Sequence, residues 1–342
     1  MSFKDGHAMA VRFYTDAEKH QLLDIVESLG MDAEKYRGGV YAFPNTTCTF
    51  RIVPAEKTID YLGQPSICAV MAGNGVRFHS VPEFGRLAEL GFPLGTRCPV
   101  FHVPHDGDQF PPELMRSVCV PEEVFLDYHE KMRDVGVWSM VPREYRPVPY
   151  QCERFKISRL LCDVERFIGP EEVMERYGMG FCYEKAFDGT KIKEVTDELK
   201  ELTLRFYTEH HSQMDKICRK HHRMLLFDLH SYSDEIVPTD FLCEGVQTPD
   251  VCIGTDPRFT PPQLLQTAEE HLNAAGFSVA LNYPYSGCYV PNSALAGESD
   301  CISIMLEFHK RIYLDQHGAP IEEQLERIRG VIMQILLDSL TL

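Results

Sequence analysis

Paired cysteines are absent from this sequence, although its 342 residues include twelve cysteines. The cysteines are scattered singly, and no two of them stand in a CxxC spacing. A zinc finger or ribbon, and equally a dense disulfide scaffold, would bring cysteines together along the chain. We therefore expect reduced and mostly buried thiols, as in a cytoplasmic protein.

Targeting and membrane signals are also absent, and positive charge is scarce. The N-terminal residues lack the charged-then-apolar pattern of a signal peptide, and no apolar run approaches the roughly 20 residues of a membrane span. The sequence contains 34 lysines and arginines but 51 aspartates and glutamates, which gives a net charge of −17. Nucleic-acid binding needs a basic surface. We expect a soluble cytoplasmic protein without nucleic-acid or membrane partners, and the sequence leaves its oligomeric state open.

What the sequence does contain is two regions of different pattern, separated by the chain-breaking stretch of residues 91–95. In residues 1–95, strand-like segments at 11–14, 48–53 and 66–71 and an amphipathic segment at 17–29 predict a small α+β region. In residues 96–342, short apolar segments alternate with longer amphipathic ones. We predict strands at 99–103, 224–229, 278–281 and 302–306, and helices at 121–133, 193–220, 261–275 and 321–339. This alternation is typical of an α/β domain, which places its ligands beyond the carboxyl ends of its strands.

Two of the predicted strands run directly into a histidine. His105 follows the apolar segment 99–103. His230 directly follows the apolar segment 224–229, which contains Asp228. Histidine is a frequent zinc ligand, and its second ring nitrogen usually has an orienting partner. Two histidines at equivalent strand ends therefore predict a metal site.

A catalytic zinc site needs a third ligand and a base that can take a proton from water. Asp106, Asp108 and Asp134 are all candidates for the third ligand, and spacing alone does not choose among them. Glu307 stands at the end of the predicted strand 302–306, where a carboxylate is costly unless it is exposed, paired or functional. Glu307 is the candidate base, and the alternative is a glutamate that merely stands at the exposed end of the strand.

Two further segments carry side chains suited to binding an anionic substrate. Arg159 and Arg166 lie in a segment in which charged and apolar residues alternate, and arginine can bind a carboxylate through two parallel hydrogen bonds. The same arginines could instead pair internally with Asp163 and Glu165. The stretch 282–290 places three tyrosines around a glycine turn, which could line a pocket or pack beneath a loop.

Several motifs, taken in their order along the chain, resemble those of the N-formylglutamate amidohydrolase family. The matching stretches are Pro104-His-Asp-Gly with Phe110-Pro111, Asp134 with Val137, Ser158-Arg followed by Asp-Val-Glu-Arg-Phe, Gly178-Met-Gly, Asp228-Leu-His-Ser, Asn282-Tyr-Pro-Tyr-Ser-Gly-Cys-Tyr, and Glu307 with Arg311 and Tyr313. Together they extend over residues 99–315 and leave the N-terminal region uncovered. The family is related in fold to zinc carboxypeptidases, so the resemblance implies a central mixed sheet flanked by helices, with residues 1–95 as a small α+β extension.

The resemblance also implies a role for individual residues. It makes His105 and His230 ligands of a single Zn²⁺ ion and Glu307 the general base. It implies that Arg159 polarises the scissile carbonyl and that Arg166 binds a substrate carboxylate. Tyr285 and Tyr289 would assist in substrate binding.

The third ligand and the pocket lining are where this sequence departs from related patterns. In the carboxypeptidases the first histidine is followed three positions later by a glutamate, and here that position holds Asp108. The motif around Asp134 is more regular in the family, which favours Asp134 as the third ligand. Trp138 stands where a carboxylate is usual, and Cys288 stands where a second glycine is common.

The function implied is zinc-dependent hydrolysis of the amide bond of an N-formyl or other N-acyl acidic amino acid, a reaction of histidine degradation in the case of N-formylglutamate. Two alternatives stay open from the residues alone. One is a carboxypeptidase-like or peptidoglycan-fragment amidase, and the other is a non-catalytic relative that only binds its ligand.

Overall fold

The computed structural model of the protein describes residues 97–142, 150–221, 223–340 and 342, together with the backbone of five short strands before residue 97. The chain divides into two units, Met1–Thr96 with Arg143–Tyr150, and Arg97–Pro142 with Gln151–Leu342. Each unit is described by itself.

The described part of the first unit consists of strands. β1 (Ala8–Val11), β3 (Thr49–Ile52) and β2 (Tyr41–Ala42) form a three-stranded sheet in that order, and β4 (Ile67–Ala72) pairs antiparallel with β5 (Gly75–Ser80). β3 and β4 confirm the strands predicted at 48–53 and 66–71. β1 begins earlier than the strand predicted at 11–14 and includes its first residue, Val11, whereas residues 12–14 lie outside the described residues. The helix predicted at 17–29 lies outside the described residues.

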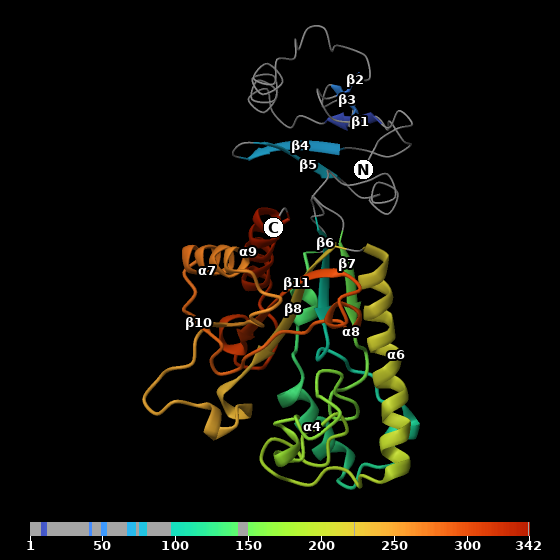
Figure 1. Ribbon diagram of the computed structural model, residues 1–342. Coiled ribbons are helices and arrows are strands. Elements are labelled where there is room, and N and C mark those ends of the chain that lie inside the picture. The colour runs from blue at the N-terminus through green and yellow to red at the C-terminus, as the bar shows by residue number, and fades with distance from the viewer. Residues whose placement is uncertain are drawn as a thin grey trace. The chain divides into compact units, whose positions relative to one another are not determined.

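The second unit is built on a six-stranded mixed sheet (Figure 1). In sheet order its strands are β10 (Val279–Leu281), β9 (Val251–Gly254), β11 (Asp300–His309), β8 (Arg223–Tyr232), β6 (Cys98–Val103) and β7 (Gln151–Arg154). β11, β8, β6 and β7 run parallel, whereas β9 is antiparallel to β11. The predicted mixed sheet is therefore confirmed, and the carboxyl ends of four adjacent strands lie along one edge.

Apolar side chains on both faces of the central strands explain why this sheet is covered on both sides. β6 is buried along its whole length, as expected of a parallel strand between two helical layers. Val100 packs with residues of β8, β11 and two helices on one face, while the next residue, Phe101, stacks on Phe227 with ring centroids 5.2 Å apart. Successive residues of a strand thus contribute to opposite faces.

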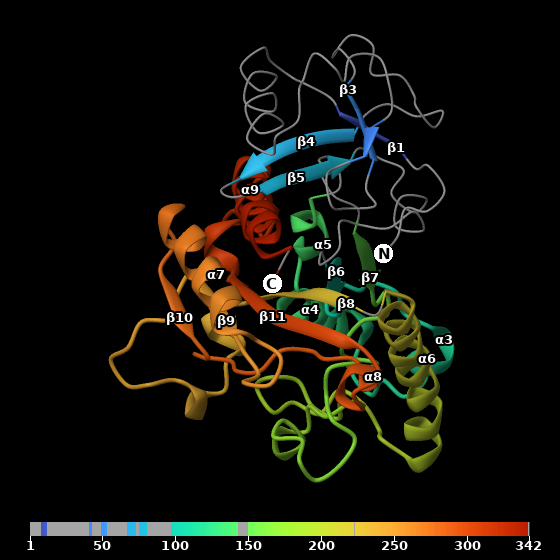
Figure 2. The same cartoon turned by 45° about the horizontal axis from the view of Figure 1, so that its top comes forward.

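The helices lie on both sides of this sheet (Figure 2). Four long helices were predicted, and they are α4 (Glu122–Met132), α6 (Asp197–His221), α7 (Pro262–Ala274) and α9 (Glu322–Ser339). The shorter elements are α3 (Pro112–Met115), α5 (Val137–Met140), α8 (Asn292–Leu295), η3 (Glu175–Tyr177), η4 (Asp234–Ile236), η5 (Thr239–Phe241) and η6 (Lys310–Ile312). α6 begins at Asp197 rather than at Lys193, because the Thr196 hydroxyl accepts a hydrogen bond from the Leu199 amide at 3.1 Å and caps the helix there.

Six of the described cysteines are buried, in line with the expectation of mostly buried thiols, namely Cys98, Cys162, Cys182, Cys218, Cys252 and Cys301. Within the described residues, none of the helices has the length and apolarity needed to span a membrane.

Candidate functional site

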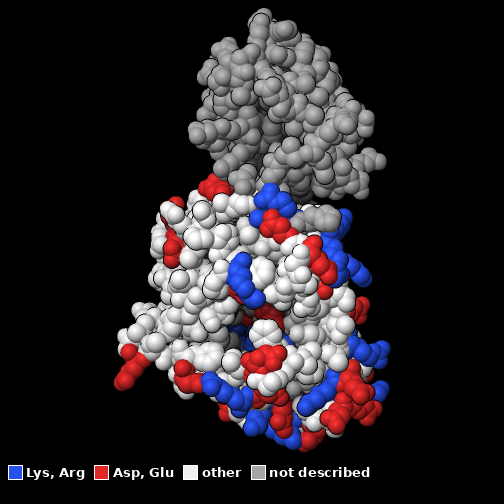
Figure 3. Space-filling model, in the orientation of Figure 1, with Lys and Arg blue, Asp and Glu red and all other residues white. Residues whose placement is uncertain are grey.

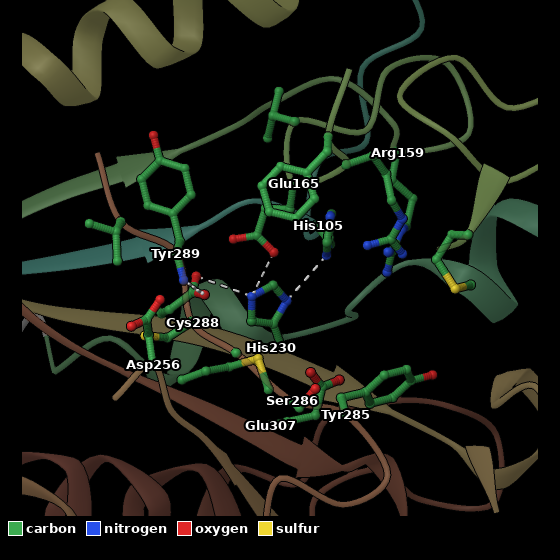
Figure 4. Close-up of a pocket in the computed structure, with 18 of the residues that line it drawn as sticks. His105, Arg159, Glu165, His230, Asp256, Tyr285, Ser286, Cys288, Tyr289 and Glu307 are labelled. Atoms are coloured by element: carbon green, nitrogen blue, oxygen red, sulfur yellow. Dashed lines mark hydrogen bonds and ion pairs between the residues drawn. The ribbon is translucent and has the colours of Figure 1, made fainter. Parts of the chain in front are cut away.

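The pairing of three parallel strands brings together the two strand-end histidines and the strand-end glutamate. His105 follows β6 by two residues, His230 lies in β8, and Glu307 lies in β11 directly opposite His230 in the strand register. All three side chains are buried, and they converge on one pocket (Figure 4). The expected meeting of strand ends is therefore present in the fold.

A glycine turn fixes the position of His105. A Cβ atom on Gly107 would lie 2.4 Å from the carbonyl oxygen of Ile157, which is closer than real Cβ atoms come to backbone. Only glycine therefore allows the turn after β6 to pack against the backbone at residues 156–157. The close packing of this turn against residues 156–157 also keeps His105 near the segment that carries Arg159.

Three potential ligand atoms lie at the mutual distances that a metal ion requires. Nδ1 of His105 and Nδ1 of His230 are 3.2 Å apart, and Oδ2 of Asp134 lies 3.7 Å and 3.4 Å from these two nitrogens. Ligand atoms of a tetrahedral zinc, each 2.0–2.1 Å from the ion, are separated by about 3.3 Å. These atoms fit a single divalent ion.

Asp134 is held in this position by the backbone. It follows α4, its amide donates to the carbonyl of His105 at 3.0 Å, and its Oδ2 accepts from the amide of Ser231 at 3.1 Å. Burial alone would raise the pKa of Asp134, but the two imidazoles and the charge of Arg159 hold this pKa well below its usual value. The carboxylate is thus kept ionised between the histidines.

The second ring nitrogen of each histidine faces a carboxylate. Nε2 of His105 donates to Oδ1 of Asp163 at 2.8 Å, and Nε2 of His230 lies 3.0 Å from Glu165 and 3.1 Å from Asp228. A carboxylate partner at Nε2 leaves Nδ1 of a neutral imidazole with a free lone pair. Histidine ligands of metal ions are usually oriented by such a partner.

Glu165 competes with Asp134 for the place of third ligand. Two further groups of histidine and carboxylate atoms among the described residues could hold a metal ion, His105–Glu165–His230 and His102–Glu165–Asp228, and both contain Glu165. Glu165 approaches His230 from the Nε2 side, whereas Asp134 faces the Nδ1 atoms of both histidines. Because the two Nδ1 atoms face one another, the arrangement favours Asp134 as the ligand and Glu165 as an orienting partner.

The other aspartate weighed from the sequence, Asp108, does not join this cluster. Its side chain is 55% exposed, and it lies 3.6 Å from Arg133 and 3.9 Å from Arg154. Asp106 is buried beside the cluster, where it accepts from the amide of Trp138 at 2.7 Å. Neither residue pairs a carboxylate oxygen with an imidazole in the part of the chain that the structure describes.

A second buried network supports the carboxylates near His230. Nδ1 of His102 donates to Oδ1 of Asp228 at 2.9 Å, and its Nε2 is 2.9 Å from Nε2 of His210. Burial opposes a charge on His102, but the carboxylates of Asp228 and Glu165 raise its pKa to about 9. The resulting positive charge offsets one of these two buried negative charges.

The two predicted arginines share one buried aspartate. Asp163 accepts from Arg159 Nη2 at 3.0 Å and from the Tyr183 hydroxyl at 2.9 Å, and it lies 3.7 Å from Nε of Arg166. Burial opposes the charge of Arg166, yet Asp163 raises its pKa above the usual value. The internal pairing foreseen as an alternative is present, and both arginines also line the pocket.

The pocket has a volume of about 370 Å³ and is lined by seven of the eight predicted site residues, all except Asp134. The seven are His105, Arg159, Arg166, His230, Tyr285, Tyr289 and Glu307. The hydroxyl of Tyr289 is hydrogen-bonded to Nδ1 of His211 at 3.1 Å, and Cys288 also lines the pocket. On the face drawn in Figure 3 the surface is hollowed, with acidic and basic atoms visible inside the hollow.

Glu307 has the environment of a proton acceptor with a raised pKa. Burial raises the pKa of Glu307 to about 8, with His230 opposing this shift and Asp134 adding to it. A general base works best when its pKa lies near the working pH. Glu307 is thus a buried carboxyl group that lines the pocket and binds its proton more tightly than an ordinary glutamate does.

Sequence reasoning did not assign functional roles to Asp163, Glu165 and His102. The first two were noted only as internal partners of the arginines. The signal that could have found them is the need of each buried histidine for an orienting carboxylate. His102 lies inside the apolar segment 99–103, and only its strand register opposite Asp228 reveals its partner.

Comparisons with known proteins bear on both sequence and fold. The sequence model of the N-formylglutamate amidohydrolase family matches residues 98–314. An N-formylglutamate amidohydrolase from Ralstonia eutropha JMP134 is 19% identical with a TM-score of 0.57, covering 72% of this chain and 94% of that chain. At this identity it supports the fold alone.

Two further solved structures are more distant. A gene product of Agrobacterium tumefaciens is 16% identical with a TM-score of 0.48, covering 71% of this chain and 89% of its own. An N-acetylmuramoyl-L-alanine amidase from Clostridium difficile 630 is 10% identical with a TM-score of 0.32, covering 71% and 96%. No curated protein matches the chain.

Proposed function

The chain belongs to the N-formylglutamate amidohydrolase family, and we propose that it is a zinc-dependent enzyme that hydrolyses the amide bond of an N-acyl acidic amino acid. Membership of this family makes the chain a hydrolase of amides. The metal, the substrate and the roles of individual residues are the proposal.

The observation that carries the proposal is the facing pair of Nδ1 atoms, 3.2 Å apart, with Asp134 Oδ2 within 3.7 Å of both. In this proposal His105, His230 and Asp134 hold the ion. A bound Zn²⁺ supplies Lewis-acid chemistry, because it polarises a carbonyl and lowers the pKa of water. Asp163 and Glu165 orient the two imidazoles.

Proton transfer belongs to Glu307 in this scheme. Its carboxylate takes a proton from the attacking water and returns that proton to the leaving nitrogen, so that the amine departs neutral. The position of Glu307 opposite His230 in the strand register supports this role, since it brings the carboxylate to the metal ligands.

Arginine side chains stabilise the negative charges of the reaction. Arg159 donates to the oxygen on which charge develops, and hydrogen bonds of this kind often supply the largest part of a rate enhancement. Arg166 binds the carboxylate of the substrate, and Tyr285 adds to the wall of the pocket. Because both arginines are largely buried beside Asp163, they are preorganised and need little rearrangement on binding.

A hydrolysis screen tests this proposal. The purified protein, with zinc added, is incubated with N-formyl, N-acetyl and N-succinyl derivatives of glutamate, aspartate and leucine, and the released amine is measured. We expect zinc-dependent release from the glutamate or aspartate derivatives and at least tenfold less from those of leucine. A protein that binds no zinc and releases no amine under these conditions would refute the proposed activity.

A further inference from the structure

The pocket contains an apolar part that the chemistry described above does not use. Its lining includes Phe167 and Leu295, whose exposed fractions are 64% and 47%. Side chains that line a pocket and are also exposed to solvent lie at its opening. Met174, Met179 and Ile236 add further apolar surface to the lining.

The two arginines assigned to the proposed chemistry lie deeper than this apolar rim, whereas a third arginine of the lining, Arg258, is 69% exposed and pairs with Asp256. The side chains of Arg159 and Arg166 are 10% and 17% exposed, and His105, His230 and Glu307 are buried. If Arg166 holds the carboxylate of the leaving amino acid, that half of the substrate occupies the buried end. The acyl half then points toward the opening, where Phe167 and Leu295 lie.

A formyl group is too small to use this surface. It contributes one carbon beyond the scissile nitrogen, and that carbon has to lie at the reaction centre itself. Cavities of about 300–1,000 Å³ are typical of sites for drug-sized ligands, and the volume here is about 370 Å³. A formylated amino acid would leave the apolar rim exposed to water.

We propose that the preferred substrate carries an apolar acyl group of several carbons, such as a medium-chain fatty acyl or aromatic acyl group, which packs against Phe167 and Leu295. This inference rests on the proposed function, because it takes the acidic leaving group as bound by Arg166. The binding free energy becomes more favourable because the apolar surfaces of the acyl group and of the rim are both removed from water.

Kinetics on an acyl series tests the inference. N-Formyl-, N-acetyl-, N-butanoyl-, N-hexanoyl- and N-benzoylglutamate are compared with zinc present, through kcat/KM for amine release. Each methylene that becomes buried is expected to raise kcat/KM by about fourfold. We therefore expect at least a tenfold preference for N-hexanoyl- over N-formylglutamate, and a preference for the formyl substrate would overturn the inference.

Matched variants test whether Phe167 and Leu295 cause the expected preference for the hexanoyl substrate. Phe167→Ala and Leu295→Ala are each expected to reduce the hexanoyl-to-formyl ratio of kcat/KM by about threefold to tenfold. Val173→Ala and Leu281→Ala serve as controls, because these apolar residues are 58% and 45% exposed but do not line the pocket. Equal ratios in all four variants would contradict an acyl-binding role for the rim.

Binding to the Glu307→Gln variant separates this inference from the proposed function. Calorimetry with N-formyl- and N-hexanoylglutamate is expected to give a Kd at least tenfold lower for the hexanoyl compound. If this difference is found but no wild-type hydrolysis occurs, the proposed reaction fails and the acyl-binding rim stands. If hydrolysis occurs and the two Kd values are equal, the rim inference alone fails.

Discussion

At the scale of single residues, one buried carboxylate organises most of the site. Asp163 accepts hydrogen bonds from His105, Arg159 and Tyr183. Burial would raise the pKa of Asp163, but the charges of Arg166, His105 and Arg159 hold it well below the usual value. A single negative charge thus orients a candidate metal ligand and both arginines.

The identity of the third metal ligand can be tested by two isosteric changes. Asp134→Asn removes a charged ligand, and we expect zinc affinity to fall by more than 100-fold. Glu165→Gln alters an orienting partner, for which losses of about 10–100-fold are typical. Competition with a chromogenic chelator measures both affinities, and a larger loss in Glu165→Gln would reverse the assignment.

At the scale of elements, the sequence predicted the strands and helices whose apolar pattern is strong and missed those whose pattern is weak. β6, β8 and β11 are buried on both sides and read as continuous apolar runs. β7 is a half-buried edge strand with the sequence QCER, and β9 has four residues ending in Gly254. β7 contains too few apolar residues to indicate a strand, and the apolar run of β9 is only three residues long.

The site was predictable to the extent that it depends on strand ends. His105, His230 and Glu307 were found as candidates because each ends an apolar run, and the family resemblance is confirmed by the match over residues 98–314. The opposition of Glu307 to His230 could not be foreseen, since strand register depends on tertiary pairing. The roles of these residues stay predictions.

The turn after β6 gives a prediction at this scale. Gly107→Ala forces a Cβ against the Ile157 carbonyl, so we expect the free energy of unfolding to fall by about 1–3 kcal/mol and activity to decrease. Gly330→Ala in α9 is the matched control. Apart from its chain neighbours and the adjacent backbone of α9, no atom of the described residues lies within 4 Å of its added Cβ, and we expect a gain of about 0.5–1 kcal/mol. Urea unfolding measures the free energy of unfolding of both variants. An unchanged value in Gly107→Ala would contradict the close packing described for this turn.

At the scale of the whole molecule, a net charge of −17 surrounds a pocket that contains two buried arginines. The long-range field of the protein repels an anionic substrate, while the arginines attract it at short range. Salt weakens the long-range repulsion far more than the buried attraction, since the Debye length falls from about 30 Å at 0.01 M to about 8 Å at 0.15 M. Under the proposed function, the pocket rather than the overall charge therefore determines the binding of an anionic substrate.

This balance predicts the direction of the salt effect. We expect kcat/KM for an N-acylglutamate to rise as sodium chloride increases from about 10 to 150 mM. The uncharged N-acylglutamate diamide serves as a binding control, and its inhibition constant should not change with salt. A fall in kcat/KM over the same range would mean that positive potential extends beyond the pocket.

The central claim is that adjacent strand ends combine a zinc site with a catalytic carboxylate, and it is tested most directly by measuring zinc content and turnover together in Glu307→Gln. Glutamine keeps the shape of the side chain but cannot take a proton from water. We expect the variant to retain one zinc per chain and to lose at least 100-fold in kcat. Full turnover in a zinc-loaded Glu307→Gln protein would contradict the account.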